Sequence, residues 1–112
     1  MSAVDFNGLD TLVHGPVRLG VITALYVEGP LDFTTLVKRF EVADGAMGVH
    51  LRKLEDAGYV ACQRQFVGRR PKSTYRITAA GRRALRQYLA TMQQIIDLAQ
   101  RDERPPTSHA GK

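Results

Sequence analysis

The stretch from Ala43 to Tyr59, ADGAMGVHLRKLEDAGY, constrains the fold more than any other part of this sequence. With a rotation of about 100° per residue, Met47, Leu51 and Leu54 fall on one face of a helix, and His50 falls at its edge. The opposite face contains residues that are small or charged: Gly45, Val49, Arg52 and Asp56. The stretch therefore predicts an amphipathic helix that buries one face and leaves a nearly bare face for a partner.

A short turn joins this helix to the one before it. Asp32 is a typical N-cap residue for a helix over residues 33–40, where apolar residues recur on one side. Only Glu41, Val42 and Ala43 separate that helix from the one that begins at Asp44. This is the spacing of a helix-turn-helix motif, and the apolar Val42 indicates a turn that packs onto the core.

The N-terminal part of the chain supplies the predicted centre of the domain. Residues Val17 to Val27 are apolar almost all round, which is typical of a buried helix, and Gly20 indicates close packing there. Residues Leu9 to His14 predict a short helix that ends before a glycine and a proline.

A basic hairpin is predicted after the amphipathic helix. Residues Tyr59 to Phe66 and Ser73 to Ile77 contain strand-forming residues and should pair as antiparallel strands. The connection, Val67 to Lys72, contains a glycine, a proline and three cations, so its tip should be solvated and positive. Since two strands alone are marginally stable, Leu31 is a candidate for a third strand.

A long helix closes the domain, from Ala79 to about Arg101, with Thr78 as its cap. Its apolar residues recur with alternating spacings of four and three: Leu85, Leu89, Met92, Ile96 and Ala99. Tyr88 and Ile95 widen this seam. Such a helix extends roughly 34 Å, longer than a core of this size can cover, so its distal half should pack on a second chain. The alternative is that it packs back on its own domain with residues 9–14.

Composition sets broad limits. At 112 residues the chain fits one domain, here 1–103, followed by a disordered tail, 104–112. The net charge of +5 favours a polyanionic partner. With one cysteine, Cys62, no internal disulfide forms, and we expect a cytoplasmic protein without a signal peptide or membrane span.

Four runs carry a family resemblance: HGPVRLGVITAL, DFTTLVKRF, DGAMGVHLRKLEDAGYV and FVGRRPKSTYRITAAGRRAL. Over residues 9–90 the chain resembles small winged-helix transcriptional regulators close to the MarR and ArsR families. The resemblance implies an α+β, mostly α fold: a winged helix-turn-helix with a long C-terminal dimerisation helix. It also implies a homodimeric repressor or activator that places a recognition helix, residues 44–57, in the major groove of double-stranded DNA. The hairpin is then the wing, and its connection, residues 67–72, lies on the DNA backbone or in the minor groove.

The resemblance and the residue pattern give two sets of candidate residues. The candidate DNA contacts lie at the start of the supporting helix, in the recognition helix and in the wing: Thr34, Thr35, Asp44, Gly45, Ala46, Gly48, Val49, Arg52, Lys53, Arg64, Arg69, Arg70 and Lys72. The candidate dimer contacts lie in the two terminal segments: Leu9, Leu12, Leu85, Tyr88, Leu89, Met92, Ile95, Ile96 and Ala99.

The candidate contacts differ in the part of the DNA that they can bind. Phosphates should supply most of the affinity, because each neutralised phosphate releases counterions. Arg52 is the best candidate for a base edge, since its planar fork matches guanine, whereas Lys53 suits a phosphate. Val49 and Ala46 can contact a thymine methyl group. Relatives commonly carry more polar groups early in this helix, so direct base readout should be weak.

Other kinds of site have little support. His14, His50 and His109 do not form a metal-binding spacing with the lone cysteine, and the sequence lacks a phosphate-binding loop, a nucleophile elbow and paired catalytic carboxylates. We therefore expect no cofactor, no metal and no enzyme activity. Two alternatives to a simple regulator stay open: a winged-helix protein-interaction module, and a MarR-like switch with a small-molecule effector between the long helix and the core.

Overall fold

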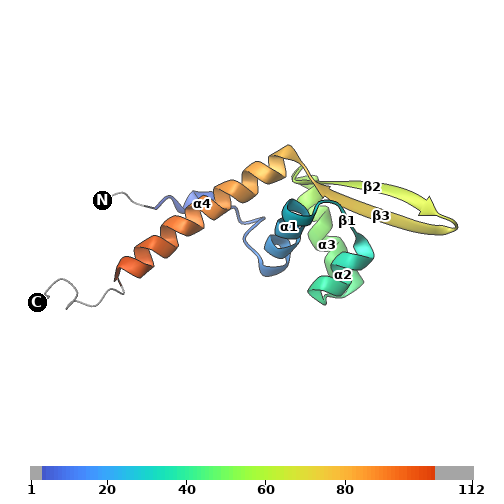
Figure 1. Ribbon diagram of the computed structural model, residues 1–112, viewed down its shortest axis with the longest axis horizontal. Coiled ribbons are helices and arrows are strands. Elements are labelled where there is room, and N and C mark those ends of the chain that lie inside the picture. The colour runs from blue at the N-terminus through green and yellow to red at the C-terminus, as the bar shows by residue number, and fades with distance from the viewer. Residues whose placement is uncertain (1–3, 103–112) are drawn as a thin grey trace, which may run out of the picture.

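The computed structural model describes residues 4–102, which form an α+β fold dominated by helices, as predicted. The elements follow one another in this order: η1 (Phe6–Gly8), α1 (Pro16–Glu28), β1 (Leu31–Asp32), α2 (Phe33–Phe40), α3 (Asp44–Asp56), β2 (Val60–Val67), β3 (Arg70–Ile77) and α4 (Ala79–Asp102). The three strands form an antiparallel sheet in the order β1-β3-β2. Helices α1, α2 and α3 cluster at the centre, while α4 and the β2–β3 hairpin project from this cluster in opposite directions (Figure 1).

The core forms around α1, as its apolar sequence predicts. Val21, Ile22 and Leu25 of α1 are buried together with Leu36 of α2 and Met47 of α3. A Cβ atom added at Gly20 would lie 2.5 Å from the Phe40 ring, so this glycine does permit close packing of α1 and α2. The apolar face of α3 is therefore used inside the domain, which leaves its opposite face outside.

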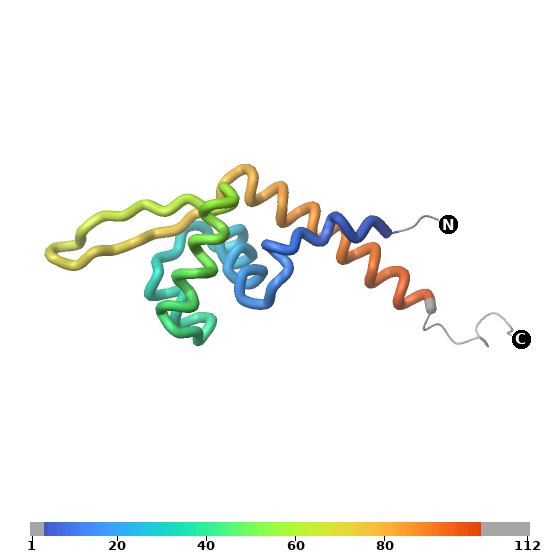
Figure 2. Tube along the Cα trace, turned by 180° about the vertical axis from the view of Figure 1, so that it is seen from behind, coloured from blue at the N-terminus to red at the C-terminus, as the bar shows by residue number. Residues whose placement is uncertain are grey.

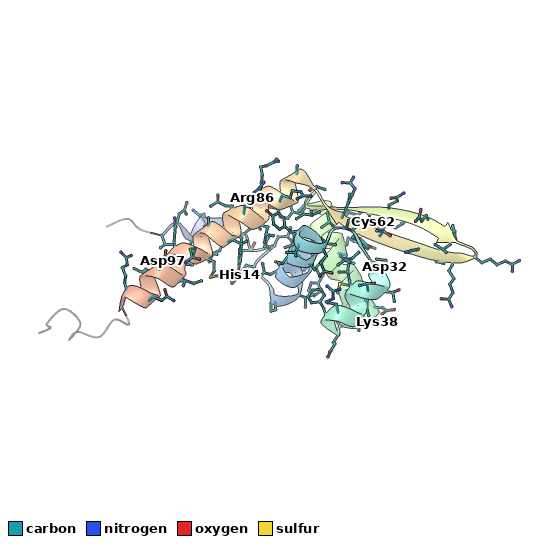
Figure 3. All side chains as sticks on the ribbon, viewed as in Figure 1. His14, Asp32, Lys38, Cys62, Arg86 and Asp97 are labelled. Carbon is teal, nitrogen blue, oxygen red and sulfur yellow. The ribbon has the colours of Figure 1, made fainter. Side chains whose placement is uncertain are left out.

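Local capping groups fix the predicted helix boundaries. Asp32, which lies where β1 meets α2 (Figure 3), accepts a hydrogen bond from the Thr35 backbone N–H at 2.8 Å. Thr78 accepts one from the Gly81 N–H at 3.0 Å at the start of α4. Between α2 and α3, Glu41 adopts a left-handed conformation with φ of 53° and ends α2. The three-residue turn of the helix-turn-helix motif is confirmed.

The predicted helix over residues 9–14 is wrong, because these residues form a turn. The carboxylate of Asp10 accepts a hydrogen bond from the Leu12 N–H at 2.8 Å and another from the Tyr59 hydroxyl. Such side-chain bonds compete with helical ones. Leu9 and Leu12 pack against the core of their own chain. The short helix η1 instead precedes this turn and lies beside α4, as Figures 1 and 2 both show.

The hairpin is longer than predicted. Its strands run to Val67 and from Arg70, so the connection is only Gly68 and Arg69 and not residues 67–72. Gly68 has a φ of 65°, which suits the first position of a two-residue hairpin turn. Pro71 is tolerated because β1 pairs only with Thr74 and Tyr75, so β3 is an edge strand near the turn. The predicted third strand at Leu31 is confirmed.

The apolar seam of α4 is buried in the domain core in its first half and partly exposed in its second half. Leu85 and Tyr88, which we predicted at a dimer interface, are instead buried in the core of their own chain. Farther along, Leu89 and Ile96 are 48% and 40% exposed, and Met92 and Ile95 are half-buried. The proximal half of α4 thus belongs to the domain core, and only its distal half offers an apolar surface. The predicted tail, residues 104–112, lies outside the described residues.

Candidate nucleic-acid interface

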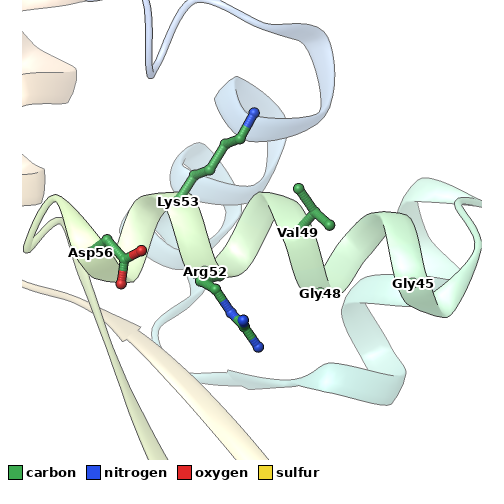
Figure 4. Close-up of a pocket in the computed structure, with 6 residues that line it drawn as sticks. All are labelled: Gly45, Gly48, Val49, Arg52, Lys53 and Asp56. Atoms are coloured by element: carbon green, nitrogen blue, oxygen red, sulfur yellow. The ribbon is translucent and has the colours of Figure 1, made fainter.

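The outer face of α3 forms a shallow groove. A hollow of about 370 Å³ is lined by six residues, which Figure 4 draws: Gly45, Gly48, Val49, Arg52, Lys53 and Asp56. Arg52 and Lys53 extend on opposite sides of the helix (Figure 4). Val49 is exposed and lies between the glycine-rich start of α3 and its cationic end. The structure thus brings together most of the residues that we predicted on this helix.

The two glycines of this face do not serve the packing of the domain. A Cβ atom added at Gly45 or at Gly48 would meet no heavy atom of residues 4–102 within 4 Å, in contrast to the crowded surroundings of Gly20. Glycine inside a helix costs about 1 kcal/mol relative to alanine. The two glycines therefore cost helix stability, and no contact within the described part of the chain accounts for them.

The start of α2 lies beside the wing. Thr34 is exposed, whereas Thr35 is half-buried and its backbone N–H is bonded to Asp32. The hydrogen bonds from Thr35, followed by the charges of Lys72 and Lys38, lower the pKa of Asp32. The ammonium group of Lys72 lies 3.8 Å from the Asp32 carboxylate. Of the two threonines, Thr34 has the freer side chain for an external contact.

The wing carries four exposed cations that we predicted as DNA contacts: Arg64, Arg69, Arg70 and Lys72. Arg64 pairs with Glu55 of α3 at 3.9 Å, and Lys72 pairs with Asp32. Both pairs are long and solvent-exposed, so each contributes little to stability. Arg69 and Arg70 make no ion pair with any residue between 4 and 102. These two guanidinium groups are available charges at the tip of the wing.

Strand β2 of the wing lies beside the last turn of α3. The Arg64–Glu55 contact joins β2 to the last turn of α3, and Arg52 lies one turn before Glu55 on the same flank. Figure 4 shows Arg52 extending toward the side from which the hairpin strands leave. The cationic end of the groove and the wing therefore adjoin on one side of the domain.

Comparison with known proteins identifies the fold. Residues 17–96 match the family described as winged helix DNA-binding domain. The chain belongs to this family. It is 30% identical to the uncharacterized protein MJ0432 of Methanocaldococcus jannaschii over 84 residues, which cover 75% of this chain and 91% of that protein. The predicted resemblance to winged-helix regulators is confirmed.

Two solved structures share the winged-helix fold. A transcriptional regulator homologue from Pyrococcus horikoshii OT3 aligns with a TM-score of 0.73 and 25% identity, covering 81% of this chain and 91% of that one. A putative MarR-family transcriptional regulator from Enterococcus faecalis V583 aligns with a TM-score of 0.73 and 19% identity, covering 89% and 90%. By domain and by fold, this chain is thus a winged-helix protein with the architecture of MarR-family regulators.

Sequence reasoning missed a polar link behind the recognition helix. Arg18 of α1 donates to Nδ1 of His50 at 3.1 Å and to the Leu12 carbonyl at 2.5 Å. Because arginine can only donate, Nδ1 of His50 must accept, which requires the neutral imidazole. Burial, and then the charges of Arg18 and Lys53, lower the pKa of His50. A histidine at the edge of an apolar face was the only signal for this link.

A second hollow lies between α1 and α4. Five residues line its volume of about 320 Å³: His14, Gly15, Pro16, Leu19 and Tyr88. Nδ1 of His14 and the Tyr88 hydroxyl are 2.7 Å apart and hydrogen-bonded, so the polar groups of this hollow already satisfy each other. It lies between the long helix and the core, where the alternative of a ligand-responsive switch would require an effector site.

Neither a cluster of metal ligands nor a membrane-spanning helix occurs among the residues that the structure describes. Between residues 4 and 102, no three histidine, cysteine, aspartate or glutamate side chains lie where they could hold a metal ion together. Cys62 is half-buried opposite Tyr75 in the hairpin. In the same part of the chain, no helix combines the length and the apolar character that crossing a membrane requires.

Proposed function

We propose that this winged-helix protein is a homodimeric transcriptional repressor that places α3 in the major groove of DNA and the wing on the adjacent backbone or minor groove. The observation that carries the proposal is the bare face of α3, whose two glycines pack against nothing in the described chain, next to the cations of the wing. A side-chain-poor helix can lie deep in a groove about 12 Å wide. Cations at its end and on the wing then meet the phosphates on both sides.

Two classes of contact follow from this placement. Arg69, Arg70 and Lys53 neutralise phosphates and supply most of the affinity, because each contact releases condensed counterions. Arg52 reaches a guanine edge, and Val49 contacts a thymine methyl group. Thr34 at the start of α2 adds a backbone contact. The protein acts as a repressor by occupying a promoter.

The distal half of α4 is the proposed dimer surface. Leu89 and Ile96 are exposed there, and Ala99 continues the same stripe. A two-fold axis along this stripe would bury both copies against each other and repeat the DNA contacts symmetrically. The two recognition helices should then contact half-sites about 34 Å apart.

Fluorescence anisotropy on duplex DNA, with the oligomeric state measured by sedimentation, tests the proposal. We expect a dimer whose affinity falls steeply as salt rises. Leu89→Glu and Ile96→Glu should give folded monomers that bind DNA weakly. A wild-type protein that ignores duplex DNA, but captures a protein partner in a fixed ratio, would instead support the interaction module.

A ligand-responsive switch is a second candidate function, because the hollow beside Tyr88 and His14 has the volume for a small organic molecule. An effector there would replace the His14–Tyr88 hydrogen bond and displace the turn that Arg18 joins to α3. A thermal-shift screen that returns a ligand whose effect disappears in Tyr88→Ala would support this regulation.

A further inference from the structure

The wing carries apolar side chains where a soluble hairpin would ordinarily carry polar ones. Phe66 is 72% exposed and Val67 is 58% exposed, and both adjoin the two-residue turn. Neither was among the residues that we predicted to contact DNA. Exposed aromatic surface of this kind commonly marks a binding site.

The register of the hairpin gathers these residues into one tip. Phe66 lies opposite Pro71, and Arg64 lies two residues before Phe66, so all three share one face of the ribbon. Val67 lies opposite Arg70 on the other face. The tip therefore has an apolar pair, Phe66 and Pro71, with cations on both faces and Arg69 at its end.

The rest of the described chain does not cover this tip. Strand β1 pairs only with Thr74 and Tyr75, near the base of the hairpin, and the helices lie at that base (Figure 1). The phenyl ring of Phe66 is thus presented to a partner rather than to the core. Because Arg64 shares the face of Phe66 and Arg69 and Arg70 lie at the same end of the hairpin, that partner is a polyanion.

Duplex DNA fits this polyanion better than an anionic membrane does. Arg64, on the face of Phe66, is joined to Glu55 of α3, so the apolar tip extends from the flank of the bare helix face. A flat lipid surface would contact the wing tip without using the bare face of α3. A duplex has adjacent grooves, one for α3 and one for the wing tip.

We propose that Phe66, supported by Pro71, enters the minor groove as an apolar wedge between two base pairs, while Arg69 and Arg70 hold the flanking phosphates. This inference rests on the proposed DNA-binding function and deepens it. An inserted apolar side chain partly unstacks a base step and bends the duplex toward the major groove. Pyrimidine–purine steps unstack most easily, so the wing selects sites through DNA deformability. This readout compensates for an α3 face that has few groups for base edges.

Phe66→Ala in the full chain tests the wedge, with Val27→Ala as the matched control because Val27 is 73% exposed at the end of α1. Bending is measured by energy transfer between dyes at the two ends of a duplex, and affinity by anisotropy over a salt series. We expect Phe66→Ala to abolish the bend and to lower affinity about ten-fold, within the range of aromatic–base contacts. The salt slope should stay unchanged, because no phosphate contact is lost. Val27→Ala should match the wild type.

The outcomes separate the wedge from the underlying function. If Phe66→Ala bends and binds DNA like the wild type, while Arg69→Ala with Arg70→Ala weakens binding, the wedge is wrong and the DNA-binding proposal stands. If the wild type does not bind DNA, both are wrong. Phe66-dependent binding to vesicles of phosphatidylcholine and phosphatidylserine, with no effect on DNA, would overturn the wedge in favour of a membrane contact.

Discussion

Removing the two guanidinium groups at the tip of the wing is the most quantitative test of how this protein holds DNA. Arg69 and Arg70 make no ion pair within residues 4–102, so each can neutralise a phosphate without giving up an internal partner. Each such contact contributes about 0.9 to the slope of log K against log salt. The double substitution Arg69→Gln and Arg70→Gln should therefore reduce this slope by about 1.8.

This slope change has a measurable consequence. Between 50 and 200 mM salt, roughly a four-fold change, the wild type should lose about twelve-fold more affinity than the double variant. The variant is thus much weaker at low salt, and the two proteins converge as salt rises. Anisotropy on one duplex over a salt series measures both slopes, and the thermal midpoints should agree because these residues are exposed.

A control with the same loss of net charge makes the result specific. Arg83 and Arg86 are exposed on α4, and Figure 3 places Arg86 away from α2 and α3. Arg83→Gln with Arg86→Gln should leave the slope within a few tenths of the wild-type value. Equal slopes for the two double variants, or a wing variant with an unchanged slope, would refute the assignment of phosphate contacts to the wing.

Three further outcomes follow from the packing and the titration of named groups. Gly81→Ala should destabilise the fold by about 1–3 kcal/mol in chemical denaturation, because its Cβ would lie 2.1 Å from the Tyr59 carbonyl oxygen; an unchanged midpoint would show that α4 can shift. Gly48→Ala should instead raise the stability by up to about 1 kcal/mol and weaken DNA binding. A Gly48→Ala variant that binds DNA as the wild type does would contradict a close approach of α3 to the duplex. Since the pKa of His50 is lowered below its usual 6.5, the unfolded chain takes up the proton first, so stability should fall as pH drops below about 6.5. His50→Gln should flatten that part of the stability profile, and an identical profile in the variant would contradict the neutral imidazole that accepts from Arg18.

Local signals in the sequence were sufficient for most of the fold. The apolar periodicity of α1, the cap at Asp32 and the three-residue turn before Asp44 each depend on neighbours within a few positions. Such features survive in the folded state because tertiary contacts reinforce them. The same holds for the bare and cationic faces of α3, which follow directly from helical geometry.

The predictions that failed depend on partners far along the chain. The turn at residues 9–14 forms because Asp10 meets Tyr59, 49 positions away. The hairpin is longer than predicted because Pro71 lies where β3 is at the edge of the sheet, and an edge strand tolerates the missing N–H of proline. Leu85 and Tyr88 are core residues and not dimer contacts, because α1 and the turn before it pack on that side of α4. The exposure of Phe66 could not be predicted from the sequence either, since an apolar residue in a strand is ordinarily a core residue.

The claim that α3 and the wing grip one duplex is tested most directly by DNA cleavage from a tethered iron chelate. In a Cys62→Ser background, Ala43→Cys places the chelate just before α3 without filling its bare face, and Gln65→Cys places it on the wing. On a duplex selected from random sequences, the two conjugates should cleave at discrete positions about 5 base pairs apart, half of a helical turn. Cleavage from only one of the two positions, or cuts that coincide, would contradict the account.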